Sequence, residues 1–176
     1  MKRKNFYEVF GYTNPMECMT LQRFGLNGIC LEVGPFNGKS TIAMAEVAEL
    51  VYSVDTFKSD DQGEKQLNEK TTYDAFMENI KGYDNIIVVE GLSYEVIPPL
   101  DIECDFVFLD GLHDELNTER DIQITWPKLK MGGVLALHDY LFYKHPAVRK
   151  MFVKYFGEPE GVQDLVCWTT KTREEL

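Results

Sequence analysis

The chain has 176 residues, of which 44% are hydrophobic and 27% are charged, and its formal net charge is −11. This length and balance predict one globular domain over residues 1–176, and the negative charge disfavours a nucleic-acid substrate because phosphate backbones would be repelled. No apolar run approaches the about 20 residues of a membrane-spanning helix, and no signal-peptide pattern follows the basic N-terminus. We therefore expect a cytoplasmic protein without a membrane partner.

Short apolar runs alternate with longer amphipathic segments along the chain. After a helical or irregular lead-in over residues 1–28, the pattern predicts, in order, strand 29–33, a helix from about 40 to 48, strand 50–55, helix 73–80, strands 85–90 and 104–110, helix 116–126, strand 134–138, helix 146–156 and strand 165–170. Such alternation is typical of a parallel sheet covered on both faces. We predict an α/β fold with a doubly wound, mostly parallel sheet, helices on both faces and strand 29–33 at its centre.

The cysteines and the basic residues point to ordinary structural roles. The four cysteines are scattered without paired spacing, so they predict buried reduced thiols rather than disulfides or a metal cluster: Cys18, Cys30, Cys104 and Cys167. The one basic cluster alternates with apolar residues at helical spacing, so an amphipathic helix with a solvated basic face is favoured: Lys144, His145, Arg149, Lys150 and Lys154.

Ligands of doubly wound sheets bind beyond the carboxyl ends of the strands. This rule selects five places in the sequence, each directly after an expected strand: residues 34–38, Asp55, 91–93, 110–113 and 138–140. Most of the unusual polar residues of the chain fall there. We therefore expect the 29–141 region to form the ligand-binding core, and residues 142–176 to add a C-terminal helix and strand.

The first of these places carries a glycine turn, Glu32-Val33-Gly34-Pro35-Phe36-Asn37-Gly38. Glycines allow the backbone to curl tightly and to approach a ligand closely, although a plain tight turn would have the same pattern. The turn lacks the third glycine of a dinucleotide-binding fingerprint. Asp55 ends the next strand, where a carboxylate can accept hydrogen bonds from both hydroxyls of a ribose; a helix cap is the alternative.

Histidines and acids stand together at two further strand ends. His113 follows Asp110, and His138 precedes Asp139, whereas His145 has the pattern of a surface residue. Histidine titrates in the range that general base catalysis requires, so His113 and His138 are candidate bases, with His138 slightly preferred. Asp110 and Asp139 offer the hard oxygen ligands that suit Mg²⁺. Hydrogen bonding between rim loops, or a helix cap at Asp139, would explain the same residues without chemistry.

Five motifs in matching order resemble the class I S-adenosylmethionine-dependent methyltransferases, in particular the small branch that includes macrolide-sugar O-methyltransferases. They span 32–41, 54–57, a loose match at Asp60, Asp61 and Gly63, then 108–113 and 132–140. The resemblance implies a Rossmann-like methyltransferase fold, S-adenosylmethionine as cofactor, and O-methylation of a small-molecule hydroxyl such as that of a sugar or natural product. It leaves a homo-oligomer open. The short lead-in leaves little room for a substrate lid, and the segment after residue 156 looks too brief for the usual final pair of long strands.

By this resemblance, ten residues form the cofactor site: Glu32, Gly34, Phe36, Gly38, Asp55, Thr56, Gly91, Leu92, Ser93 and Asp110. Residues 91–93, which follow the strand expected at 85–90, would lie near the adenine. The expected catalytic residues are His138, His113 and Asp110, and the expected metal ligands are Asp110 and Asp139.

Two alternatives belong to other classes of protein. Residues 34–41 resemble the phosphate-binding loop of nucleotide hydrolases, but only three residues separate the two glycines where that loop needs four. A non-catalytic binding subunit with a cofactor fold is the other alternative, because a fold alone does not establish activity. It would have no need for Asp110, His113, His138 and Asp139 together at one rim.

Overall fold

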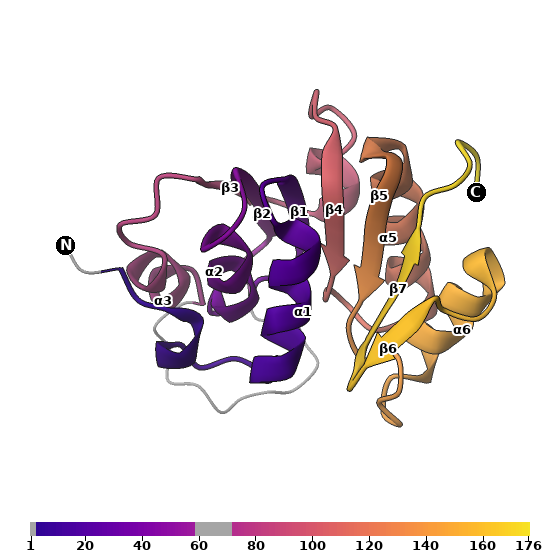
Figure 1. Cartoon of the computed structure of the whole chain (residues 1–176), viewed down its shortest axis with the longest axis horizontal. Coiled ribbons are helices and arrows are strands. Elements are labelled where there is room, and N and C mark those ends of the chain that lie inside the picture. Colours follow the sequence, from indigo (N-terminus) through magenta and orange to yellow (C-terminus); the bar gives the residue numbers. More distant parts are fainter. Residues whose placement is uncertain (1–2, 59–71) are drawn as a thin grey trace.

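The computed structural model describes residues 3–58 and 72–176 and contains a seven-stranded sheet in the order β3-β2-β1-β4-β5-β7-β6 (Figure 1). The strands β1 to β5 are parallel, β7 runs antiparallel to β5, and β6 runs antiparallel to β7. Their bounds are β1 Ile29–Val33, β2 Leu50–Asp55, β3 Ile86–Glu90, β4 Cys104–Leu109, β5 Leu129–Leu137, β6 Gly161–Gln163 and β7 Val166–Thr170. The order reverses between β1 and β4, which is where ligands of such sheets bind.

Helices cover both faces of this sheet. On one face lie α1 (Pro15–Gly25), α2 (Lys39–Ala45) and α3 (Thr72–Asn79), and on the other lie α4 (Ser93–Val96), α5 (Glu115–Thr125) and α6 (Pro146–Phe156). Short 3₁₀ turns at η1 (Phe6–Glu8) and η2 (Trp126–Lys128) complete the elements. The two described ends of the chain lie at opposite ends of the long axis in Figure 1. The predicted α/β fold class is confirmed.

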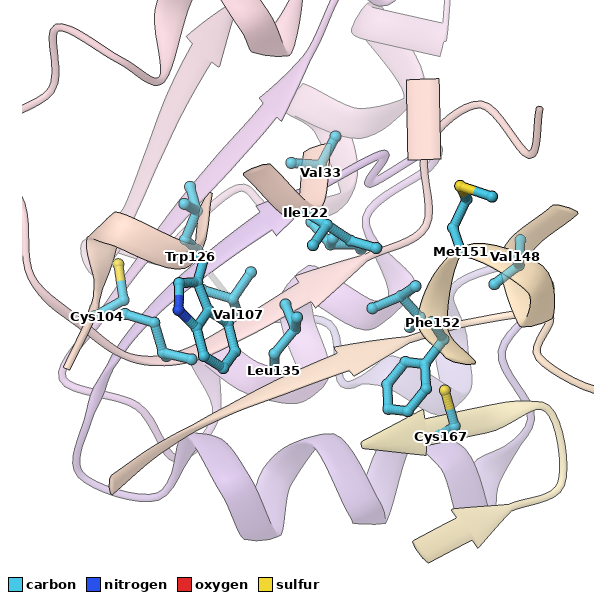
Figure 2. Close-up of a cluster of buried hydrophobic side chains, with 14 of the residues drawn as sticks. Val33, Cys104, Val107, Ile122, Trp126, Leu135, Val148, Met151, Phe152 and Cys167 are labelled. Carbon is cyan, nitrogen blue, oxygen red and sulfur yellow. The ribbon is translucent and has the colours of Figure 1, made fainter. Parts of the chain in front are cut away.

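Alternation along β4 explains why its sequence is continuously apolar. Phe106 and Phe108 pack with α1 and α2, whereas Val107 and Leu109 pack with α5 and α6. Figure 2 shows the hydrophobic cluster on the side of α5 and α6, in which Val107 lies beside Trp126 and Leu135. A strand that buries both faces has no polar side, so periodicity alone could not show which helices cover which face.

Three details differ from the sequence-based expectations. Strand β1 is third in the order, directly beside the central β4. Strand β5 begins at Leu129 rather than at 134, and the Gly132-Gly133 pair lies inside it, where the pairing with β4 shifts register. The expected last strand is β7, and it pairs with a short additional strand, β6, that the sequence did not indicate. The loosely matched Asp60, Asp61 and Gly63 lie outside the described residues.

The lead-in is helical and well capped. Asn14 caps α1 by accepting the backbone N–H groups of Met16 and Glu17, and Pro15 occupies the first turn. The four cysteines are buried and free. None of the helices in the described ranges is both long and apolar enough to cross a membrane.

Candidate active site

The glycine turn joins the carboxyl end of β1 to the start of α2, and it touches the end of β4. Gly34 has φ +86°, and a Cβ atom there would lie 2.0 Å from the backbone oxygen of Asp110. Gly38, with φ +88°, ends the turn. The N–H of Asp110 in turn donates to the carbonyl of Val33 at 2.9 Å. Only glycine fits at position 34, and the close approach brings the turn directly beside the acid that follows β4.

Glu32 lies beneath the turn rather than at its surface. Its carboxylate accepts hydrogen bonds from the hydroxyls of Ser40 at 2.5 Å, Thr41 at 2.5 Å and Ser53 at 2.8 Å. The side chain is fully buried, and this burial raises the pKa of Glu32 to about 7. Glu32 thus fixes the first residues of α2 against β1 and β2, and it does not face the rim of the sheet.

Asp55 stands at the end of β2, on the other side of the turn from Asp110. Its Oδ1 accepts the N–H of Phe57 at 2.8 Å, and burial raises the pKa of its carboxyl. Its carbonyl accepts the N–H of Gly91 at 2.9 Å, which ties the loop after β3 to the same place. Thr56 follows in the chain, and the ring of Phe36 stacks on Tyr12 with 5.4 Å between centroids.

A second group of side chains gathers at the ends of β4 and β5. Nε2 of His113 lies 2.9 Å from Oδ2 of Asp139 and 3.3 Å from Oδ1 of Asp110. Nδ1 of His138 lies 3.3 Å from Asp139 Oδ1 and 3.4 Å from Asp110 Oδ1. The two carboxylates therefore converge between the two imidazoles. Asp139 has a left-handed backbone, φ +62°, which aspartate tolerates better than most residues.

The two histidines differ in their access to solvent. The side chain of His138 is only 3% exposed, and its Nε2 lies 3.3 Å from Oε2 of the buried Glu17 on α1. Both of its ring nitrogens thus face carboxylates. The side chain of His113 is 27% exposed, and its ring stacks on that of His145 at 4.1 Å. Among the described residues, Nδ1 of His113 has no hydrogen-bond partner.

Charge pairing dominates the electrostatics of this cluster. Burial would lower the pKa of each histidine, but Asp110 and Asp139 raise the pKa of His113 to about 9, and Asp110, Asp139 and Glu17 raise that of His138 well above its usual range. The histidines in turn lower the pKa of Asp110 and Asp139 against the effect of burial. A cluster of this kind is stable only with all its partners present.

Sequence reasoning missed two acids of the site. Glu17 fits the helix-start pattern Asn-Pro-x-Glu, and it does accept the N–H of Asn14 at 2.7 Å, but it also accepts the N–H of Leu165 at 2.9 Å. Asp121, on α5, accepts the hydroxyl of Ser93 at 2.5 Å. No local pattern indicates these long-range partners.

The positions of these groups agree with the ligand-binding rule for doubly wound sheets. A family match shows to which class of protein the chain belongs. Residues 31–140, more than half of the chain, match the sequence profile of a methyltransferase domain. The chain belongs to this methyltransferase family. It is an S-adenosylmethionine-dependent enzyme, as its motifs predicted, and a nucleotide hydrolase or a non-catalytic subunit is not favoured.

Solved methyltransferase structures share the fold of this enzyme. The O-methyltransferase NovP matches with a TM-score of 0.71 at 16% identity, over 90% of this chain and 80% of that chain. An O-methyltransferase from Bacillus cereus in complex with SAH matches at 0.66 and 18% identity, over 91% and 83%. An rRNA methylase from Streptococcus thermophilus matches at 0.64 and 14% identity, over 93% and 100%. At these identities the likeness establishes the fold of the methyltransferase and leaves its acceptor open.

Proposed function

We propose that this methyltransferase transfers a methyl group to a hydroxyl of a small molecule. The observation that carries this proposal is the contact between the two halves of the site, because Gly34 of the glycine turn packs on the backbone of Asp110. A cofactor on the turn would present its methyl group beside Asp110, Asp139 and His113. NovP and the Bacillus cereus enzyme are both named O-methyltransferases.

The cofactor would lie across the ends of β1, β2 and β4. Gly34, Phe36 and Gly38 would line the amino acid part, with Glu32 acting indirectly through the start of α2. Asp55 would bind the ribose, flanked by Thr56. Gly91, Leu92 and Ser93 would border the adenine, and Asp110 would close the site on the β4 side. These roles follow the order in which the strand ends stand along the sheet.

Replacing Asp55 by alanine should weaken cofactor binding by roughly 1.5–3 kcal/mol, the range for hydrogen bonds to a charged group. Isothermal titration with S-adenosylmethionine measures this change. Asp84→Ala is the matched control, since Asp84 is an exposed acid before the opposite end of β3 and pairs with Arg3. Equal affinity of parent and Asp55→Ala would rule out the ribose assignment.

The chemical step is an in-line displacement. The acceptor oxygen forms a bond to the methyl carbon while the carbon–sulfur bond breaks, and its electron pair returns to sulfur to leave S-adenosylhomocysteine. A neutral hydroxyl is a weak nucleophile, so its proton must pass to a base during attack. Most of the remaining acceleration comes from holding the oxygen and the methyl group in line.

We assign the base to His113 rather than to His138, which the sequence slightly favours. The almost complete burial of His138 and the carboxylates at both of its ring nitrogens argue against contact with an acceptor. His113 is more exposed, and its Nε2 faces the carboxylates, which leaves Nδ1 to accept the proton. This is the arrangement in which an acid fixes the tautomer and orientation of a catalytic imidazole.

A divalent cation would fit between the two converging carboxylates. The donor atoms of Asp110, His138 and Asp139 lie within 4.8 Å of one another, and the carboxylate oxygens suit Mg²⁺. When bound, such an ion would lower the pKa of an acceptor hydroxyl and orient it. His113 must be neutral to act as a base, but Asp110 and Asp139 raise its pKa to about 9. A cation bound to these two carboxylates would lower that pKa by offsetting their negative charge.

Exhaustive treatment with EDTA should abolish methyl transfer, and Mg²⁺ should restore it. Titration of the chelated protein with Mg²⁺ should show binding that Asp139→Asn removes. Asp105→Asn is the control, because Asp105 is an acid at the opposite end of β4, held by Lys130 at 2.9 Å. Undiminished activity after chelation would contradict a metal requirement.

A small acceptor agrees better with the surface charge than a nucleic acid does. The net charge is −11, and the two lysines of α6 are paired with acids of α5: Lys150 with Glu115 at 2.6 Å and Lys154 with Glu119 at 2.5 Å. The remaining basic residue of this helix, Arg149, lies over the ring of Tyr140. Little unpaired positive charge is therefore left on that helix for phosphates. The buried free thiols suit the cytoplasm, where we place the enzyme.

A further inference from the structure

A third histidine lies beside the acid–histidine cluster, although it belongs to none of the motifs. The ring of His145 stacks on that of His113, with 4.1 Å between the centroids and 21° between the planes. His145 stands at the start of α6, but its side chain makes no capping hydrogen bond there. The ring nitrogens of His145 are therefore not used to hold the helix.

The backbone carries His145 back over the acid that follows β5. The N–H of Phe142 donates to the carbonyl of Asp139 at 3.0 Å, and the N–H of His145 donates to the carbonyl of Phe142 at 2.9 Å. On the facing side, His113 directly precedes Asp114, the N-cap of α5. The two histidines are thus placed by the starts of two helices that pack in the same hydrophobic cluster.

These two imidazoles and one oxygen of Asp139 form a donor set of their own. One donor atom from each of His113, Asp139 and His145 lies within 4.8 Å of the others. Oδ2 of Asp139 faces His113 at 2.9 Å, whereas its Oδ1 faces His138 at 3.3 Å. Asp139 therefore separates an oxygen-rich side, toward Asp110, from a nitrogen-rich side.

The nitrogen-rich side suits a different class of metal ion from Mg²⁺. Two imidazoles and a carboxylate, with water as the fourth ligand, are a donor set that holds zinc in proteins, and imidazole suits transition-metal ions in general. Donor atoms around a tetrahedral zinc ion lie about 3.3 Å apart, given zinc–nitrogen bonds of about 2.0–2.1 Å. Small rotations of the two rings, both partly exposed, would bring the three donor atoms to that spacing.

We propose that His113, Asp139 and His145 form a binding site for a transition-metal ion such as Zn²⁺, and that occupation of this site inhibits methyl transfer. Asp139 would attract a divalent ion more strongly than a single proton on His113, because the attraction scales with charge. An imidazole bound to a metal through one nitrogen carries its hydrogen on the other, so His113 could then accept no proton. The metal site stands on the geometry alone, whereas the inhibition rests on the proposed role of His113 as the base.

Titration of the chelated full chain with ZnCl₂ at neutral pH tests the site. The parent should bind Zn²⁺, and His145→Ala should weaken this binding by about tenfold or more, the usual scale for disturbing a metal site. Tyr143→Ala is the matched control, because it removes a neighbouring ring that is 79% exposed, and it should keep the parental zinc affinity. Titration with Mg²⁺ should give the same result in His145→Ala as in the parent, because no oxygen ligand is removed.

Inhibition is measured separately, relative to the turnover of each variant without zinc. Saturating Zn²⁺ should lower turnover of the parent by about 10²-fold or more, the cost of losing a general base. The same zinc concentration should leave most of the turnover of His145→Ala.

The outcomes separate the site from its effect and from the proposed function. Absence of zinc binding by the parent, or an unchanged zinc affinity in His145→Ala, would overturn the site. Zinc binding that depends on His145 but leaves turnover unchanged would overturn the inhibition. If no hydroxyl acceptor is methylated at all, the proposed function fails, and the zinc titration still decides the site.

Discussion

Replacing His113 by alanine is expected to reduce turnover of a hydroxyl acceptor by about 10²–10⁴-fold, the usual cost of removing a general base. The imidazole is the more exposed histidine of the acid–histidine cluster, and its Nδ1 can take the proton once a cation on Asp110 and Asp139 lets the ring become neutral. The acceptor is found by screening hydroxylated small molecules with the parent enzyme. Turnover under saturating cofactor then measures the effect of the mutation.

Two further histidine variants test whether the loss of turnover is specific to His113. His145→Ala removes the ring that stacks on His113 but none of the contacts between His113 and the carboxylates, so turnover should stay within about tenfold of the parent. His138→Ala should instead lower the free energy of unfolding by roughly 3–5 kcal/mol, because two buried carboxylates and the half-buried Asp110 lose their shared partner. Near-parental turnover of His113→Ala, with cofactor binding intact, would eliminate base catalysis by this residue.

The second large effect is expected from Gly34→Ala. The added Cβ atom would lie 2.0 Å from the Asp110 carbonyl oxygen, and φ is +86°, so the end of β4 and the turn must move apart. We expect the free energy of unfolding to fall by about 3 kcal/mol or more, and cofactor affinity to fall with it, because the two halves of the site meet at this contact. Chemical denaturation and cofactor titration measure the two changes.

Gly132→Ala separates the clash from the backbone strain. Gly132 has φ +81°, but no atom lies within 4 Å of a Cβ atom built on it. This variant should therefore lose only the roughly 1 kcal/mol of a left-handed non-glycine residue. Equal destabilisation by Gly34→Ala and Gly132→Ala would mean that the turn tolerates the added methyl group and does not require close approach to β4.

Local pattern was sufficient for the framework of the enzyme. The apolar runs predicted the strands β1 to β4 to within a residue at each end, because strands buried on both faces leave an unbroken apolar signal. The local pattern gave the wrong start for β5, because the Gly132-Gly133 pair indicated a turn but lies within the strand. Backbone hydrogen bonds with Lys171, which follows β7, hold these glycines in place: the N–H of Gly132 donates to the Lys171 carbonyl at 2.9 Å, and the Lys171 N–H donates to the carbonyl of Gly133 at 2.8 Å. This long-range contact has no signal in the local sequence.

The sequence by itself determined the fold class, the family and the residues at the strand ends, because parallel strands bring their carboxyl ends to one edge whatever their order. Only the tertiary structure decided how those residues divide their roles. His113 and His138 have similar local surroundings in the sequence. In the structure, however, His138 is buried beside Glu17 of α1, whereas His113 remains partly exposed. Asp121 reaches Ser93 in the same way. Such roles depend on burial and on partners far along the chain, and these are fixed only when the helices pack on the sheet.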